Sequence, residues 1–300
     1  MHKYFLLLAF IVIVGCDRDE SPTITELIEI EIDNETFTFS EDNVSMNENC
    51  GNVFLNTSPV TSGDSRFRIE MVITTNGRIK DVTYIDLSNN NSHFKAADYV
   101  PAEVFFIENY NFSPTEKTMN FEFSGTLYEI DNSQNTKSIT GKVKTDNLEF
   151  VDCLFEPWKI SADINQENFN VVDIQGDVIE TAEADGTVIS VFSEWEGISD
   201  DGFRIAIITQ QRLEDMETGT YSFGKNNSLN LVIIEKYNGP YEAIKFEDRN
   251  GEWENFQYEG ELIIEEQICI PLQRTKGSFT INAYKDDQVV YSVRNGRFSI

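Results

Sequence analysis

Alternation of apolar and polar residues is the feature that most limits how this chain can fold. The run LIEIEID at residues 27–33 puts Ile28, Ile30 and Ile32 on one face and acidic residues on the other. The run RFRIEMVIT at residues 66–74 repeats the pattern, and so do TVISVFSEW, FRIAII, LNLVII, GSFTINAY and VVYSV. A period of two is typical of a half-buried β-strand. The sequence therefore predicts an all-β protein, with room for one short helix between residues 94 and 105.

Turn signals separate these runs. Asn-Gly or Asp-Gly dipeptides begin at Asn76, Asp185, Asp201, Asn238, Asn250 and Asn295. Such dipeptides tolerate the positive φ angles of tight hairpins. Closely spaced strands with hairpin turns predict antiparallel sheets, arranged either as β-sandwiches or as lipocalin-like barrels.

The second half of the chain resembles the first. Four motif pairs keep their order, at offsets between about 135 and 152 residues, which is typical of an internal duplication. The pairs are Gly51-Asn52-Val53 with Gly186-Thr187-Val188, Phe67-Arg68-Ile69 with Phe203-Arg204-Ile205, SGTLYEI from Ser124 with KGSFTINAY from Lys276, and ITGKVKTDNLEF with VVYSVRNGRFSI, aligned at Phe150 and Phe298.

The repeat predicts two tandem domains. We expect a first β domain over residues 25–156, a linker over 157–169 and a second β domain over 170–300. Each domain then has an ordinary size for a single core. One continuous sheet shared by both halves is the alternative.

The charge balance excludes one class of partner. The chain carries a formal net charge of −29, with 52 acidic and 23 basic residues. Nucleic-acid binding through phosphates requires a basic surface, so no nucleic-acid partner is expected. An acidic surface provides solubility, and it is also able to gather cations or basic partners.

The cysteines leave two interpretations open. Cys50 and Cys153 lie near opposite ends of the first half, and Cys269 lies in the run EEQICIPL. We take Cys50 and Cys153 as a candidate disulfide, since an exported chain meets an oxidising compartment. The alternative is two buried free thiols.

The N-terminus reads as an export signal. Lys3 precedes an apolar run over residues 4–14, which is too short to span a bilayer. Ile13-Val14-Gly15-Cys16 resembles the bacterial lipobox. That resemblance implies a signal peptide over residues 1–15, a lipid on Cys16 and a tether over 16–24, so that acyl chains anchor the protein to the membrane.

Two further resemblances concern location. The acidic cluster after Cys16 resembles the surface-export signal of Bacteroidota lipoproteins, whereas Asp17 read by the enterobacterial rule would indicate the inner membrane. The ending Gly277-Ser278-Phe279 … Asn295-Gly296-Arg297-Phe298 resembles uncharacterised Bacteroidota cell-envelope lipoproteins with a small all-β domain. Together they imply a lipid-anchored outer-membrane protein, with exposure on the cell surface as one orientation, and they assign no activity.

No motif for chemistry stands out. His93 is the one histidine after the signal peptide, and neither G-x-S-x-G nor a phosphate-binding glycine loop occurs. No catalytic, cofactor-binding or metal-binding residue is therefore predicted, and we expect no enzyme. Calcium remains a weak expectation at the acidic loops 199–202, 247–250 and 286–287, since carboxylates are hard oxygen ligands.

The remaining expectation is a binding function. We expect a non-catalytic binding or envelope-interaction module for a protein or a polysaccharide, with Trp158, Trp195 and Trp253 as candidate sugar-stacking rings. A lipocalin-like small-molecule carrier is the alternative, and a carboxylate-based glycoside hydrolase is the third hypothesis.

Overall fold

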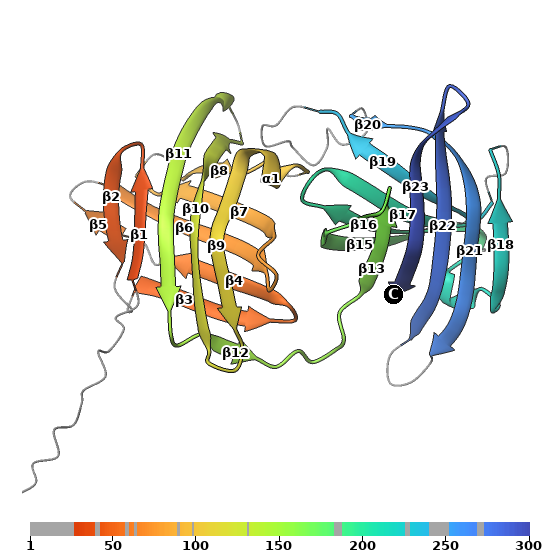
Figure 1. The fold of residues 1–300 in the computed structure, drawn as a ribbon, viewed down its shortest axis with the longest axis horizontal. Helices are drawn as coiled ribbons and strands as arrows, with labels where there is room; N and C mark the ends of the chain where they lie inside the picture. Colours follow the sequence, from red (N-terminus) through yellow and green to blue (C-terminus); the bar gives the residue numbers. More distant parts are fainter. Residues whose placement is uncertain are drawn as a thin grey trace, which may run out of the picture.

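The computed structural model of the protein describes residues 27–39, 43–57, 60–62, 65–88, 91–97, 99–130, 132–182, 188–225, 229–239, 252–268 and 273–300. These residues form two β-sheet lobes, joined by an extended segment at residues 152–158 (Figure 1). The prediction of an all-β protein is confirmed. The short helix α1 (Pro101–Val104) lies within the interval where the sequence had room for one.

The first lobe is built on one twelve-stranded sheet. Its strand order is β12-β3-β4-β6-β7-β8-β10-β11-β1-β2, with β5 paired to β6 and β9 paired to β10. Every pair is antiparallel except β12 with β3. The strands are β1 (Leu27–Ile32), β2 (Glu35–Phe39), β3 (Val44–Asn49), β4 (Asn52–Thr57), β5 (Val60–Ser62), β6 (Ser65–Thr74), β7 (Ile79–Asp86), β8 (Ser92–Lys95), β9 (Phe105–Ser113), β10 (Thr118–Glu129), β11 (Asn132–Thr145) and β12 (Glu149–Val151).

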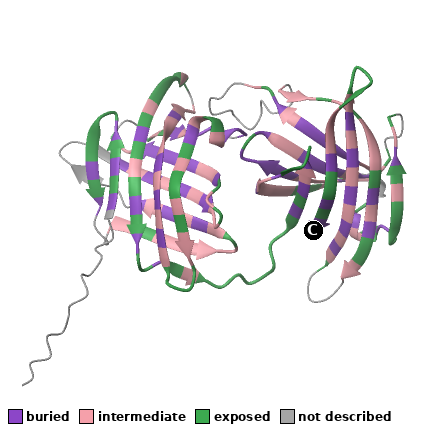
Figure 2. Cartoon of the chain, in the orientation of Figure 1, coloured by how far each residue is buried: buried purple, intermediate pink, exposed green. Residues whose placement is uncertain are grey.

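This sheet bends so that its two halves face each other around a core. In Figure 1, β9, β10 and β11 lie in front of β4 and β6. The core collects the apolar residues of the alternating runs, and Phe37 of β2 meets Phe67 of β6 edge-on at 4.7 Å. Figure 2 shows buried and exposed residues alternating along these strands. Period-two patterning therefore places one face of each strand inside the lobe.

The second lobe is a two-layer sandwich. One sheet has the order β14-β13-β23-β22-β21-β18 and the other β15-β16-β17-β19-β20, with a shared apolar core between them. Its elements are β13 (Lys159–Ile164), β14 (Glu167–Asn168), β15 (Val171–Ala182), β16 (Val188–Ser199), β17 (Phe203–Thr209), the 3₁₀ turn η2 (Leu213–Asp215), β18 (Gly219–Phe223), β19 (Leu231–Tyr237), β20 (Trp253–Glu254), β21 (Gln257–Ile268), β22 (Arg274–Lys285) and β23 (Gln288–Ser299).

None of the sheets formed by the described residues closes on itself. Their strand orders end at β12 and β2, at β14 and β18, and at β15 and β20, and β5 and β9 branch from the first sheet as further edge strands. The lipocalin-like barrel is therefore wrong as an architecture, and the sandwich alternative is correct. Large buried side chains such as Phe67, Phe121 and Phe279 occupy the space between the layers.

The strand orders of the two lobes correspond. The order β9-β10-β11-β1-β2 in the first lobe matches β21-β22-β23-β13-β14 in the second, and β3-β4-β6-β7 matches β15-β16-β17-β19. These matching orders are what a duplication would produce. The duplication itself stays a prediction.

The expected linker over residues 157–169 is too long. Within it, β13 pairs with β23 and β14 pairs with β13, so residues 159–168 belong to the second lobe. The residues between β13 and β14 form a hairpin turn, in which Asn165 and Gln166 have φ angles of 49° and 75°. Asp33 and Asn34 form the same kind of turn between β1 and β2, with φ angles of 49° and 72°. Positive φ at both central residues is the geometry of a tight type I′ hairpin.

One predicted turn is a bulge instead. Asn295 and Gly296 lie inside β23, where the register with β22 shifts between Phe279 and Ile281. Asn295 has a φ of 54°, and Gly296 lies where an added Cβ would collide with the ring of Phe279. Asn295 takes the positive φ of the bulge, and Gly296 leaves room for the Phe279 ring. The chain does not reverse its direction here.

A disulfide fixes the connecting segment to the first lobe. Cys50, in the β3–β4 turn, is bonded to Cys153, with their Cα atoms 5.0 Å apart and a sequence separation of 103. The connecting segment makes no strand pairing after β12, and its residues 151–159 are all exposed. The disulfide therefore fixes the start of the connecting segment against the first lobe.

Replacing both cysteines, Cys50→Ser and Cys153→Ser, should lower the free energy of unfolding by about 2–5 kcal/mol, because a cross-link over so long a loop restricts the unfolded chain. Urea unfolding followed by far-UV circular dichroism measures the change. Reductant should destabilise the unmodified protein and leave the double variant unaffected. An equal urea midpoint for both proteins without reductant would contradict this prediction.

Candidate functional site

An aromatic cluster joins the two lobes. Tyr99, which precedes α1 in the first lobe, lies 5.1 Å from the ring of Tyr237 and 5.2 Å from that of Trp253. Val100 and Ile198 complete the buried contact. Tyr237 of β19 pairs with Trp253 of β20, so both rings lie on the same face of the sheet. This is the outer face, because the alternating residues Val232 and Ile234 of β19 point into the core. The outer face of one sandwich thus forms part of the interface with the other lobe.

Polar contacts flank the aromatic cluster. The Arg78 guanidinium lies 3.5 Å from the Asp200 carboxylate, and the Lys80 ammonium lies 2.7 Å from that of Asp173. The backbone N–H of Ala102 also donates to the carbonyl oxygen of Asp200, at 3.2 Å. Each bond joins the first lobe to the β15–β17 region of the second.

The two aspartates differ in their pKa shifts. Burial raises the pKa of Asp200, whose side chain is 3% exposed, and Arg78 offsets this only in part. Burial would also raise the pKa of Asp173, but the hydrogen bond from Gln175 and the ion pair with Lys80 outweigh it and lower that pKa. The charge of the Asp200 carboxylate at the interface is therefore only partly compensated, whereas that of Asp173 is compensated by its partners.

A pocket of about 440 Å³ lies beside this interface. Trp158 and Pro157 of the connecting segment form one wall, and the Lys80–Asp173 pair lies in another. The remaining lining is Cys50, Gly51, Asn52, Thr74, Thr75 and Asn76 from the first lobe with Val171, Val172 and Ile174 from β15. The pocket combines an indole ring, amides, hydroxyls and one ion pair, which is a chemistry suited to polyhydroxylated ligands.

Trp158 is held in place by a second indole. Its ring meets that of Trp195 edge-on, with centroids 4.8 Å apart and planes at 80°. Trp195 packs against the core of the second lobe, and Trp158 remains 49% exposed. An edge-to-face contact is a favoured aromatic geometry and fixes the ring orientation. The exposed part of the Trp158 ring is therefore presented by a fixed support.

A second cluster surrounds Arg204 on the outer face of β17. The guanidinium contacts Glu194, Glu196 at 2.6 Å and Glu235 at 3.1 Å. Trp253 lies over it, with its ring centroid 5.8 Å from the guanidinium carbon. Burial raises the pKa of Glu235, with Arg204 opposing this and the two other glutamates adding to it. Because all three carboxylates converge on one arginine, the cluster is arranged to neutralise that cation.

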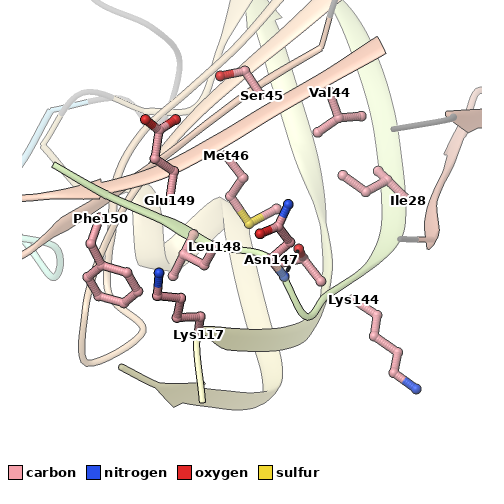
Figure 3. Close-up of a pocket in the computed structure, with 11 residues that line it drawn as sticks. Ile28, Val44, Ser45, Met46, Lys117, Lys144, Asn147, Leu148, Glu149 and Phe150 are labelled. Atoms are coloured by element: carbon pink, nitrogen blue, oxygen red, sulfur yellow. Dashed lines mark hydrogen bonds between the residues drawn. The ribbon is translucent and has the colours of Figure 1, made fainter. Parts of the chain in front are cut away.

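A pocket of about 550 Å³ lies in the first lobe (Figure 3). Ile28 of β1, Val44 and Met46 of β3, and Thr145 and Phe150 enclose it, and Lys117 and Lys144 lie at its rim. Ser45, Asn147, Leu148 and Glu149 complete the lining. The structure brings these residues together where the two halves of the bent sheet meet at β12 and β3.

The structure places the residues singled out in the sequence as follows. Cys50 and Cys153 are bonded to each other, whereas Cys16 and Cys269 lie outside the described residues. His93 lies on β8, opposite Ile85 of β7. Of the three tryptophans, only Trp158 lines a described pocket.

Two of the three acidic loops proposed for calcium lie in the described residues and have structural roles there. Asp286 and Asp287 form the β22–β23 turn with φ angles of 51° and 61°, and loop 199–202 holds the buried Asp200 at the interface. Loop 247–250 lies outside the described residues. Within the described part of the chain, no group of three or more His, Cys, Asp or Glu side chains is placed to hold a metal ion.

Sequence reasoning missed the inter-lobe surface. The sequence around Tyr99, Tyr237 and Arg204 is that of ordinary strands or loops. It does not indicate which residues these three side chains contact. One signal was available: Ile198 and Tyr237 are apolar residues on the faces that alternation assigns to solvent. Such breaks in the pattern indicate a second buried face.

Comparison with protein-family models, with curated proteins and with solved structures gave no match. In the described ranges, no helix has the length and apolar character required to cross a membrane.

Asp200→Asn should stabilise the protein at neutral pH by roughly 1 kcal/mol, because it removes a buried, poorly compensated charge. A carboxyl whose pKa is raised on folding contributes stability at low pH that is lost as the pH rises through that pKa. The gain should therefore disappear below pH ~3.9, where the carboxyl is protonated in both the folded and the unfolded state. Urea unfolding between acidic and neutral pH tests this.

The exposed Asp152→Asn is the matched control, since it changes the net charge equally. It should leave the free energy of unfolding nearly constant at both pH values. A destabilised Asp200→Asn at neutral pH would show instead that the Arg78 ion pair outweighs the cost of burial.

Proposed function

We propose that this protein is an exported, lipid-anchored binding protein of the bacterial outer membrane, whose inter-lobe pocket takes a segment of polysaccharide. The lipobox-like Cys16 and the signal-like residues before it support export and anchoring. The Cys50–Cys153 disulfide supports an oxidising compartment, since structural disulfides persist there and are rare in the cytosol.

The half-exposed ring of Trp158 is the observation that supports a polysaccharide as the ligand. A half-exposed indole supported by Trp195 offers an apolar surface of the kind that stacks on a sugar ring. Amides and hydroxyls of Asn52, Asn76 and Thr75 line the same pocket, within reach of sugar hydroxyls. The ion pair Lys80–Asp173 adds both a donor and an acceptor.

The pocket suits binding without catalysis. Its lining contains one carboxylate, Asp173, which is engaged by Lys80 and Gln175. Glycoside hydrolysis needs two carboxyl groups set across the scissile bond. The other acid cluster, around Arg204, directs its three glutamates at one guanidinium. We therefore propose a non-catalytic role.

Trp158→Ala should lower affinity for the bound polysaccharide by about tenfold or more, since burying a large apolar side chain contributes ~1.5–3 kcal/mol. Affinity electrophoresis in gels containing starch, xylan, laminarin or mannan identifies the ligand and measures the retardation. Leu154→Ala, at an exposed residue outside the pocket lining, is the control and should migrate as the unmodified protein does. Equal retardation of Trp158→Ala and the unmodified protein would reject the pocket as the site.

A protein partner is the second candidate, favoured by a different observation. Val151 at the end of β12 is 41% exposed, and Leu154, Phe155 and Trp158 of the connecting segment are 85%, 60% and 49% exposed. A group of exposed apolar side chains often marks an interaction surface. If no polysaccharide retards the protein, and Leu154→Ser with Phe155→Ser abolishes a cross-link formed on intact cells, this candidate replaces the first.

Cys16→Ser should release the protein from the membrane fraction into the soluble fraction, because the acyl chains are the proposed anchor. Fractionation of cells with immunoblotting measures this. Protease added to intact cells then distinguishes a surface orientation from a periplasmic one, with lysed cells as the control. Unchanged membrane association of Cys16→Ser would contradict the lipid anchor.

A further inference from the structure

The pocket of the first lobe has a charge pattern that sets it apart from the rest of this acidic chain. Six lysines lie in the described part of that lobe, and Lys80, Lys95, Lys137 and Lys142 each form an ion pair with a carboxylate. Lys117 and Lys144 form none with the described residues, and both line the pocket. In a chain with a net charge of −29, two uncompensated ammonium groups at one pocket are unexpected.

Lys117 is also held in a costly backbone conformation. Its φ is 57°, in the left-handed region that a turn ordinarily fills with glycine or asparagine. The carbonyl oxygen of Lys117 accepts a hydrogen bond from the N–H of Leu148 at 2.9 Å, which fixes the turn against the pocket wall. A lysine kept where another residue would be less strained is a feature of functional sites.

The wall beside these charges is partly apolar, through Val44, Met46 and Phe150, and polar atoms make up the larger part of the exposed lining. Ile28 and Leu148 are buried, and Val44, Met46 and Phe150 are half-buried parts of the same core. Figure 3 shows Lys117 extending toward Leu148 and Phe150, with the Asn147 amide at the mouth. Lys144 extends outward from the rim in this view. A bound molecule would meet a cation and an apolar surface together.

Glu149 is the one carboxylate in the lining. Its side chain points to the opposite side of the β12 backbone from Lys117 in Figure 3. The two lysines therefore leave the lining with an excess of one positive charge. The volume, about 550 Å³, lies in the range of small-molecule pockets.

We propose that this pocket binds an anionic amphiphile, with its phosphate or carboxylate at Lys117, with Lys144 adding positive charge at the rim, and with a short apolar portion against Val44, Met46 and Phe150. The same chemistry is offered by a membrane lipid headgroup with the start of its acyl chains and by a soluble amphiphilic acid. The site is separate from the inter-lobe pocket and does not depend on the polysaccharide proposal.

The test uses the exported chain with Cys16→Ser and calorimetric titration with soluble dioctanoyl phosphatidylglycerol. We expect binding that is at least tenfold tighter than that of octyl glucoside, which has no charge, and of inorganic phosphate, which has no apolar part. Equal binding of octyl glucoside, or no binding of the phosphatidylglycerol, would overturn the proposal.

Variants then locate the site. Lys117→Asn, which suits the left-handed turn, combined with Lys144→Gln should weaken binding at least tenfold, and Glu149→Gln should strengthen it a few-fold. Lys142→Gln is the matched control, because this lysine lies two residues from Lys144 and is paired with Glu122 outside the pocket. If the double variant and the control bind equally, the pocket is not the site.

Vesicles separate the two sources of ligand. Sedimentation of the Cys16→Ser chain with phosphatidylglycerol vesicles, and not with phosphatidylcholine vesicles, would assign the pocket to a membrane headgroup. Binding of the soluble lipid without sedimentation would assign it to a free amphiphilic acid. Trp158→Ala should behave as the unmodified chain in every arm.

Discussion

Burial of one face of each strand between two layers is the constraint on which the structure depends. A sheet with alternating side chains cannot remain single, because its apolar face must leave water. The first lobe meets this demand by bending one long sheet over itself, and the second lobe does so by stacking two sheets. Tight turns at Asp33-Asn34 and Asn165-Gln166 start both lobes in the same way.

The connection between the lobes uses the faces that this arrangement leaves outside. Tyr237 and Ile198 lie on the outer face of the second lobe's sheet, and Tyr99 and Val100 of the first lobe cover them. The outer face elsewhere carries charge, and there Arg204 pairs with three glutamates, whereas among the described residues its sequence counterpart Arg68 pairs with Glu70 alone. The motif Phe-Arg-Ile therefore serves two surfaces, one open to solvent and one enclosed. The disulfide and the connecting segment set the remaining edge of the interface, where Trp158 and the inter-lobe pocket lie.

The motif pairs found in the sequence correspond only in part to the matching strands of the two lobes. Two motif pairs fell on strands that correspond in order, β6 with β17 and β10 with β22. The pair aligned at Phe150 and Phe298 did not, because Phe150 lies in β12 and Phe298 lies in β23, whose counterpart is β11. The residue alignment did not hold for β10 and β22. Phe123 lies opposite Gly141, and Phe279 lies opposite Gly296, with each ring filling the space over its glycine. This equivalence is displaced by four residues from the alignment of Ser124 with Lys276. Two strands of similar composition can be aligned in several registers that keep the same residues facing the core. Only the pairing of each strand with its neighbour shows which of these registers is correct.

By itself, the sequence determined the strands, the faces they bury, the all-β class and the two-part organisation, because period-two patterning and turn residues act over a few neighbours. It also indicated the two cysteines that the structure joins, through their positions at opposite ends of one half. The sequence left the choice between sandwich and barrel open, because closure depends on which edge strands meet. The pockets, the ion pairs of Arg78 and Lys80 with the second lobe, and the unpaired state of Lys117 and Lys144 were decided by tertiary structure alone. Each of these features joins residues far apart in the chain, and no local pattern reports such a distance.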